Sequence, residues 1–308
     1  MLKYKSYVTW LIMLVVGVGL YFDNAVAQDT EAQTVELYSD VYKNTRNLHV
    51  LLPPGYFDSE NADRAYPVFY FTDGVAAWHM WGVPEVAKDL WEQGKIPPYI
   101  FVGIDNGGST KETKNPGWDR ASEYTPYADQ TWVENTPTPK GKLFPKFLFE
   151  EVMPAINGRY RTDTHAAKTG LAGDSYAGAV SLYTGIQHPN RIGLLLLESP
   201  SLHIGNGQLI VDAENAGAWP RKVYIGVGTA EGDTAEIQNQ MVSNVEQLHT
   251  IVENAADAPE VYFLLKEGAE HWYDAWRERL PYALESLLGM GGDMQMVSKD
   301  SADDSCVN

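Results

Sequence analysis

The sequence predicts an α/β protein in which a mostly parallel eight-stranded sheet is covered by helices on both faces. Three observations lead to this fold class. Short apolar runs recur along the chain, segments with a helical spacing of apolar residues lie between many of them, and two early runs are separated by a short polar turn. The 308 residues, 44% of them hydrophobic, suffice for a large core in one domain.

The predicted strands are short runs rich in β-branched, leucine and aromatic residues. The first two suit an antiparallel hairpin, because only a short turn joins them. The others alternate with helical segments and suit parallel strands. In chain order the runs are residues 34–38, 47–52, 68–72, 99–104, 168–173, 192–198, 222–228 and 261–266.

The predicted helices are residues 84–93, 143–157, 177–187, 235–255 and 272–288. The clearest is 235–255, where apolar residues at spacings of three and four form one stripe that packs on the core: Ile237, Met241, Val245, Leu248 and Val252. Two antiparallel strands followed by alternating strands and helices is the order of an α/β-hydrolase sheet.

The first 27 residues have the pattern of a secretory signal peptide. Lys3 and Lys5 precede an apolar run at 8–20, and small residues at 25–27 suit cleavage after Ala27. The run is shorter than the roughly 20 residues that a membrane-spanning helix needs. We therefore expect a secreted or periplasmic protein with no stable membrane association after cleavage.

The mature chain is predicted to be one α/β domain at 28–289, followed by a disordered tail at 290–308. Within the domain, residues 105–141 lack clear periodicity and are rich in Gly, Pro, Thr and aromatic residues. Loops of this length in compact domains are usually functional lids or disordered. The aromatic residues favour an ordered lid: Trp118, Tyr124, Tyr127 and Trp132.

Charge and composition narrow the classes of partner. The formal net charge of −18 repels phosphate backbones, so nucleic acid is not an expected partner. The sequence contains neither a phosphate-cradling Gly-rich loop nor a clustered Cys/His spacing, and we expect no metal and no cofactor. Because Cys306 is the only cysteine, the fold is expected to depend on core burial without disulfides.

Ser175, in the segment GDSYAG at residues 173–178, is the candidate nucleophile. A strand is predicted before it and a helix after it, and small residues stand two positions away on both sides, Gly173 and Ala177. This is the pattern of a nucleophile elbow, which projects the hydroxyl above the sheet. A helix N-cap is the alternative, but it would not explain the small residues on both sides.

The order of elements selects the partners of this serine. The base should lie in a loop beyond the last strand, which favours His271. The other histidines lie in strands or helices, at the wrong edge, or too early in the chain: His49, His79, His165, His188, His203 and His249. The acid should follow the seventh predicted strand, where Glu231 is preferred and Asp233 is the alternative.

Two backbone N–H groups are expected to form the oxyanion hole. One belongs to Tyr176, directly after the nucleophile, and the other to Val75, in the loop after the third strand. Trp78, Trp81 and His203 are candidates for lining the substrate pocket, where the rings could stack on a sugar or phenolic group.

With these motifs in place, the sequence resembles the family of putative esterases that includes esterase D, feruloyl esterases, S-formylglutathione hydrolase, enterochelin esterases and the mycolyltransferases of antigen 85. The matching phrases are LPPGY at 52–56, YPVFYFTDG at 66–74, the elbow, ESPS at 198–201, GTAE at 228–231, and Gly268 with His271, Trp272 and Trp276.

The resemblance implies a metal-free esterase with a Ser-His-acid triad. It supports Glu231 over Asp233 and places the second oxyanion donor at Val75. This chain has Ala177 where family members more often have Gly, and Asp174 and Tyr176 replace the commoner neighbours of the serine.

The function predicted from the sequence is hydrolysis of a carboxylic ester through an acyl-enzyme on Ser175. The substrate would be a small-molecule or polysaccharide-linked ester. Two alternatives remain open on the sequence alone: an acyltransferase of the same fold, and a binding module for carbohydrate or protein that keeps the fold without catalysis.

Overall fold

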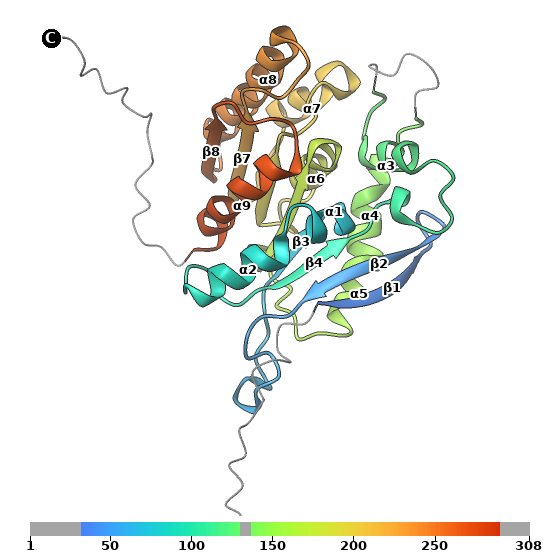
Figure 1. Cartoon of the computed structure of the whole chain (residues 1–308), viewed down its shortest axis with the longest axis vertical. Helices are drawn as coiled ribbons and strands as arrows, with labels where there is room; N and C mark the ends of the chain where they lie inside the picture. Colours follow the sequence, from blue (N-terminus) through green and yellow to red (C-terminus); the bar gives the residue numbers. More distant parts are fainter. Residues whose placement is uncertain (1–31, 130–136, 290–308) are drawn as a thin grey trace, which may run out of the picture.

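The computed structural model describes residues 32–129 and 137–289, and these residues form one mixed sheet with helices on both faces (Figure 1). The strand order is β1-β2-β4-β3-β5-β6-β7-β8. β2 pairs antiparallel with β1 and β4, and the remaining pairs are parallel. The predicted fold class is confirmed. The strands are β1 Gln33–Ser39, β2 Asn44–Leu51, β3 Val68–Phe71, β4 Ile100–Ile104, β5 Thr169–Asp174, β6 Leu194–Glu198, β7 Lys222–Gly228 and β8 Glu260–Lys266.

The central strands β3, β4, β5 and β6 are buried along their whole length. Strands covered on both faces tend to be continuous apolar runs, which made β3, β4 and β6 recognisable in the sequence. By contrast, β1 lies at an edge of the sheet. From Val35 to Ser39, exposed residues alternate with more buried ones. Because the sheet is parallel here, the carboxyl ends of β3, β5, β6 and β7 meet at one edge.

Helices cover both faces and form two separate apolar clusters. One face carries α2 Val83–Glu92 and α9 Tyr273–Leu288, which pack together. The other carries α4 Phe144–Phe147, α5 Met153–Asn157, α6 Ser175–Gln187, α7 Ile204–Glu214 and α8 Ala235–Glu253.

The helix predicted at 143–157 is present but not uniform. A π-helical segment, Leu148–Val152, joins α4 to α5. Pro154 has no N–H to donate one turn back, so the regular α-helical pattern cannot run through this point.

Three helices were not predicted: α1 Gly74–His79, α3 Pro116–Tyr124 and α7. α3 lies inside the segment expected to be a lid, and the Asn115 side chain caps its first turn by accepting from the Trp118 N–H. α7 is kinked after its first residue, where Gly205, Asn206 and Gly207 are all left-handed, and the two glycines there made a helix start hard to predict.

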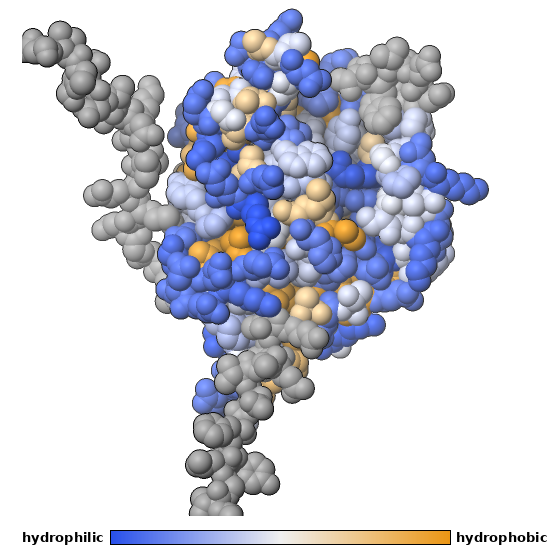
Figure 2. All heavy atoms as spheres, viewed as in Figure 1, coloured by the Kyte–Doolittle hydropathy of each residue, from blue (hydrophilic) through white to orange (hydrophobic). Residues whose placement is uncertain are grey.

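The face in Figure 2 is mostly hydrophilic, with apolar residues in small separate areas. No helix within residues 32–129 and 137–289 is long and apolar enough to cross a membrane. The predicted signal peptide, the C-terminal tail and Trp132 lie outside the described residues, as does Cys306.

Candidate active site

Ser175 occupies the sharp turn between β5 and α6, with a left-handed backbone angle φ of 51°. Such a conformation is unfavourable for a residue with a side chain, so the surrounding chain must impose it. Gly173 permits the turn, because a Cβ atom there would lie 2.2 Å from the Ala177 carbonyl oxygen. The small residues of the motif thus allow the strand end and the first turn of α6 to approach each other.

His271 connects the serine to a buried carboxylate. Its Nε2 lies 3.0 Å from Ser175 Oγ, and its Nδ1 lies 2.9 Å from Glu231 Oε2. His271 comes from the loop between β8 and α9, and Glu231 from the loop after β7. A carboxylate at Nδ1 keeps the proton on that nitrogen and leaves Nε2 able to accept the serine proton. The structure therefore brings together the three residues that chain order had selected.

Glu231 is completely buried and held in place by further hydrogen bonds. Its Oε1 accepts from the Gly228 N–H and from the Ser199 hydroxyl, both at 2.6 Å. Asp233, the alternative acid, is exposed two residues farther along the loop. The geometry thus selects Glu231 as the partner of His271.

The predicted oxyanion donors differ in their surroundings. The Tyr176 N–H belongs to the first turn of α6, where backbone N–H groups lack acceptors within the helix. The Val75 N–H instead donates to Asp105 Oδ1 at 3.0 Å, and that oxygen is also 2.9 Å from His49 Nε2. The prediction for Val75 is not met, because α1 directs this amide toward the end of β4. The adjacent amide of Gly74 has no acceptor among the described residues.

The tryptophans expected in the substrate pocket belong to the core. Trp78 is 5% exposed and packs beside His49, and Trp81 is fully buried against Phe71 and Trp276. Neither ring is open to a substrate, so these two predictions are wrong: Trp78, in α1, and Trp81, in the turn between α1 and α2, both pack into the core.

His203 is partly exposed and lines a surface cavity of about 410 Å³ between α7 and α8. Its Nε2 lies 3.8 Å from Asp129 Oδ1, and Asp129 also accepts the Tyr176 hydroxyl hydrogen bond. Asp129 therefore lies between His203 and Tyr176, the residue directly after the nucleophile.

Two serines of the segment 198–201 were not identified as site residues. Ser201 Oγ lies 3.4 Å from Ser175 Oγ, and the Ser201 N–H donates to the Ser175 carbonyl at 3.0 Å. Ser199 joins Glu231 to the indole N–H of Trp276, which donates to Ser199 Oγ at 2.9 Å. The phrase ESPS was visible in the sequence, but its contacts depend on the position of β6 beside β5.

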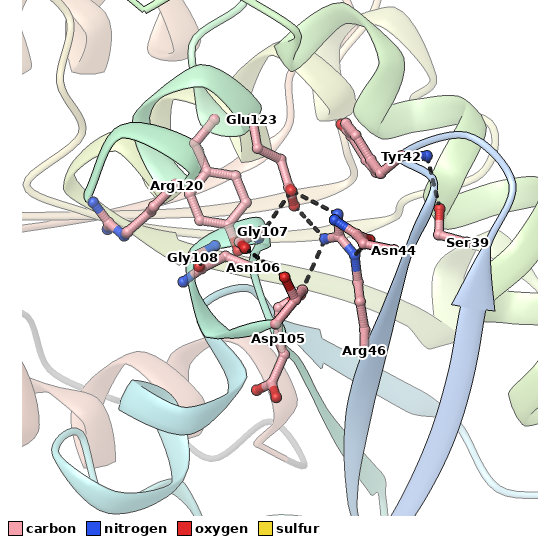
Figure 3. Close-up of polar contacts among 12 residues, drawn as sticks. Ser39, Tyr42, Asn44, Arg46, Asp105, Asn106, Gly107, Gly108, Arg120 and Glu123 are labelled. Atoms are coloured by element: carbon pink, nitrogen blue, oxygen red, sulfur yellow. Dashed lines mark hydrogen bonds and ion pairs between the residues drawn. The ribbon is translucent and has the colours of Figure 1, made fainter. Parts of the chain in front are cut away.

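The segment predicted as a lid is fastened to the sheet by a buried ion pair. The Arg46 guanidinium, from β2, donates to both carboxylate oxygens of Glu123 in α3, at 2.5 and 2.7 Å. Figure 3 shows this pair together with Gly107, whose N–H also donates to Glu123. α3 is therefore a fixed part of the site's surroundings.

Within the part of the chain that the structure describes, no group of three or more His, Cys, Asp or Glu side chains is arranged to hold a metal ion. The chemistry available at this site is that of the serine, the imidazole, the carboxylate and nearby backbone N–H groups.

Comparison with known proteins identifies the family of this chain. The family model described as "Putative esterase" matches residues 39–287. An uncharacterized protein of Bacillus subtilis (strain 168), YbbA, is 22% identical over 249 residues, which cover 79% of this chain and 93% of that protein.

Solved structures share the fold. The BES protein from Bacillus cereus has a TM-score of 0.67 and 20% identity, and the match covers 92% of this chain and 99% of that one. An IroE-like serine hydrolase from Shewanella oneidensis has a TM-score of 0.63 and 20% identity, covering 83% and 79%. The chain belongs to the Putative esterase family and is a carboxylic ester hydrolase with the α/β-hydrolase fold.

Proposed function

We propose that this protein is a serine esterase that works through an acyl-enzyme on Ser175, with His271 as the general base and Glu231 as the acid of the triad. The single observation that carries the proposal is the continuous contact from Ser175 Oγ through the His271 ring to the buried Glu231 carboxylate. A module that only binds needs no base at a serine hydroxyl, so this contact favours catalysis.

In the first step Ser175 Oγ attacks the ester carbonyl while His271 Nε2 takes the hydroxyl proton. Glu231 stabilises the resulting imidazolium without taking its proton. The tetrahedral intermediate collapses, His271 gives the proton to the leaving alcohol, and the acyl group remains on Ser175. Water then enters and attacks the acyl carbon while His271 removes its proton, and His271 returns that proton to Ser175 Oγ as the acyl–oxygen bond breaks and the acid leaves.

The negative charge of the intermediate would be held by backbone N–H groups at the starts of α6 and α1. Tyr176 supplies one, and the turn at 73–75 supplies the other through the Gly74 amide. Each such donor typically lowers the barrier by about 3 kcal/mol.

The export signal predicted at residues 1–27 leads us to propose that the enzyme acts outside the cytoplasm on a small or polysaccharide-linked ester. The serine hydrolase name of the Shewanella oneidensis protein supports the chemistry proposed here.

The test is hydrolysis of p-nitrophenyl acetate by the purified protein and two matched variants. Ser175→Ala should lower kcat by at least about 10⁴-fold, because the nucleophile is lost. Ser243→Ala, which changes an exposed serine on α8, should retain the activity. Undiminished hydrolysis by a folded Ser175→Ala protein contradicts the proposal.

A further inference from the structure

Asp174, the residue before the nucleophile, is a buried acid that the proposed mechanism does not use. Its side chain is 1% exposed, and neither carboxylate oxygen has a hydrogen-bond partner among the described residues. The nearest cationic atom recorded for it is Arg120 Nη2, at 3.8 Å. A buried carboxylate without donors is unfavourable when charged, which favours the uncharged acid.

Arg120 is already paired with another carboxylate. Its Nε lies 3.0 and 2.8 Å from the two oxygens of Asp73, and its Nη2 donates to Asp73 Oδ2. The Asn106 amide also donates to Asp73. One guanidinium therefore faces two buried carboxyl groups and forms its hydrogen bonds with only one of them.

Arg120, Asp73 and Asp174 form a cluster that lies between two segments of the proposed site. Asp73 has a left-handed φ of 54° and begins the turn that carries the Gly74 amide. Asp174 leads into Ser175, and the Arg120 guanidinium carbon lies 5.9 Å from the centre of the Tyr176 ring. Arg120 thus touches both segments that supply the proposed oxyanion donors.

The groups facing Asp174 come from four elements: Asp73 after β3, Arg120 in α3, Glu198 at the end of β6 and Tyr273 in α9. Burial, with a contribution from Asp73, raises the pKa of Asp174 to about 7, while Arg120 opposes the shift. Ionisation of Asp174 would therefore fall in the neutral range.

We propose that Asp174 is a positioning residue of the esterase site: as an uncharged acid it allows Arg120 to hold the Asp73 turn beside the nucleophile elbow, and when ionised it opposes the oxyanion. The inference rests on the proposed serine esterase function. The oxyanion forms beside Ser175, directly after Asp174, so a second buried negative charge raises the energy of the transition state.

The test is the pH profile of kcat/KM for p-nitrophenyl acetate, corrected for spontaneous hydrolysis. For the unaltered protein we expect a decline of about tenfold between neutral pH and pH 9 as Asp174 ionises. Asp174→Asn, similar in size but unable to ionise, should lose this decline. Asp63→Asn, at an exposed position, should keep it.

A second measurement is independent of activity. Infrared difference spectra of the Ser175→Ala protein between pH 5 and pH 9 should show loss of a buried carboxylic acid band, and Asp174→Asn in that background should lack the change. Absence of the band from the Ser175→Ala protein overturns the inference, as does an unchanged alkaline decline in Asp174→Asn. The expected band together with no ester hydrolysis in any variant overturns the proposed function instead.

Discussion

At the scale of single residues, the site contains non-glycine residues with unfavourable backbone conformations. Asp73 and Ser175 are both non-glycine residues with left-handed backbones, at φ values of 54° and 51°. Each such conformation costs of the order of 1–3 kcal/mol and persists only where the surrounding structure enforces it. Here the Arg120 pairing holds Asp73, and the absence of a side chain at Gly173 permits the turn at Ser175.

The two candidate acids can be separated by matched substitutions. Glu231→Gln should lower kcat by about 10³- to 10⁴-fold, because an amide cannot stabilise the imidazolium. Asp233→Asn, on the same loop but exposed, should change kcat less than about twofold, within the range of surface substitutions. Steady-state kinetics of both variants on one ester gives the answer, and the opposite ranking would assign the acid to Asp233.

Asp174 should also affect stability in a pH-dependent way. Its pKa in the folded protein is raised to about 7 from 3.8, so the folded state binds more protons between these values and stability falls as pH rises through that range. The unfolding free energy of Asp174→Asn minus that of the unaltered protein should therefore be larger at pH 8 than at pH 4. The expected increase in this difference is up to about 4 kcal/mol.

Urea unfolding of both proteins at pH 4 and pH 8 measures this difference. If the gap in unfolding free energy between the two proteins is the same at both pH values, Asp174 does not ionise as described.

At the scale of elements, α3 depends on its buried ion pair with β2. The Glu123 side chain is 4% exposed and the Arg46 side chain 0%, so removal of one partner leaves the other charge buried. Glu123→Ala should cost about 3–5 kcal/mol of unfolding free energy. Glu112→Ala, at an exposed position nearby, is the control. Equal urea midpoints for the two variants would show that the pair does not anchor α3.

The elements that sequence analysis found are those with a clear physical signature. The buried strands β3, β4 and β6 are largely apolar runs, and α8 carries a stripe of which Val245, Leu248 and Val252 are buried. α7 was missed because left-handed residues at 205–207 interrupt any helical pattern. α3 was missed although Asn115 and Pro116 form a typical helix start, because it has only nine residues and most of them are polar.

Some residues of the site could also be predicted from the sequence, and others could not. Ser175, His271 and Glu231 could be selected because chain order fixes which loops meet at the carboxyl edge of a parallel sheet. The direction of the Val75 amide and the burial of Trp78 depend on how α1 packs on the sheet. The roles of Asp174 and Arg120 were equally hidden, since their contact joins residues 54 positions apart in the sequence.

At the scale of the whole molecule, the pattern of residues 1–27 predicts export, and the proposed site of action outside the cytoplasm depends on that prediction. The net charge of −18 disfavours binding to anionic surfaces. Mass spectrometry of the exported protein should find a mature N-terminus at Gln28, because the small residues at 25–27 suit the signal peptidase. An exported protein that retains residues 1–27 would contradict this assignment.

The central claim is that His271 and Glu231 activate Ser175 as the nucleophile. The most direct measurement is peptide mapping by mass spectrometry after reaction with a fluorophosphonate, which modifies only an activated serine. The account predicts a single adduct on Ser175, lost in the His271→Ala protein. No adduct in the folded protein, or an adduct on another serine, would contradict it.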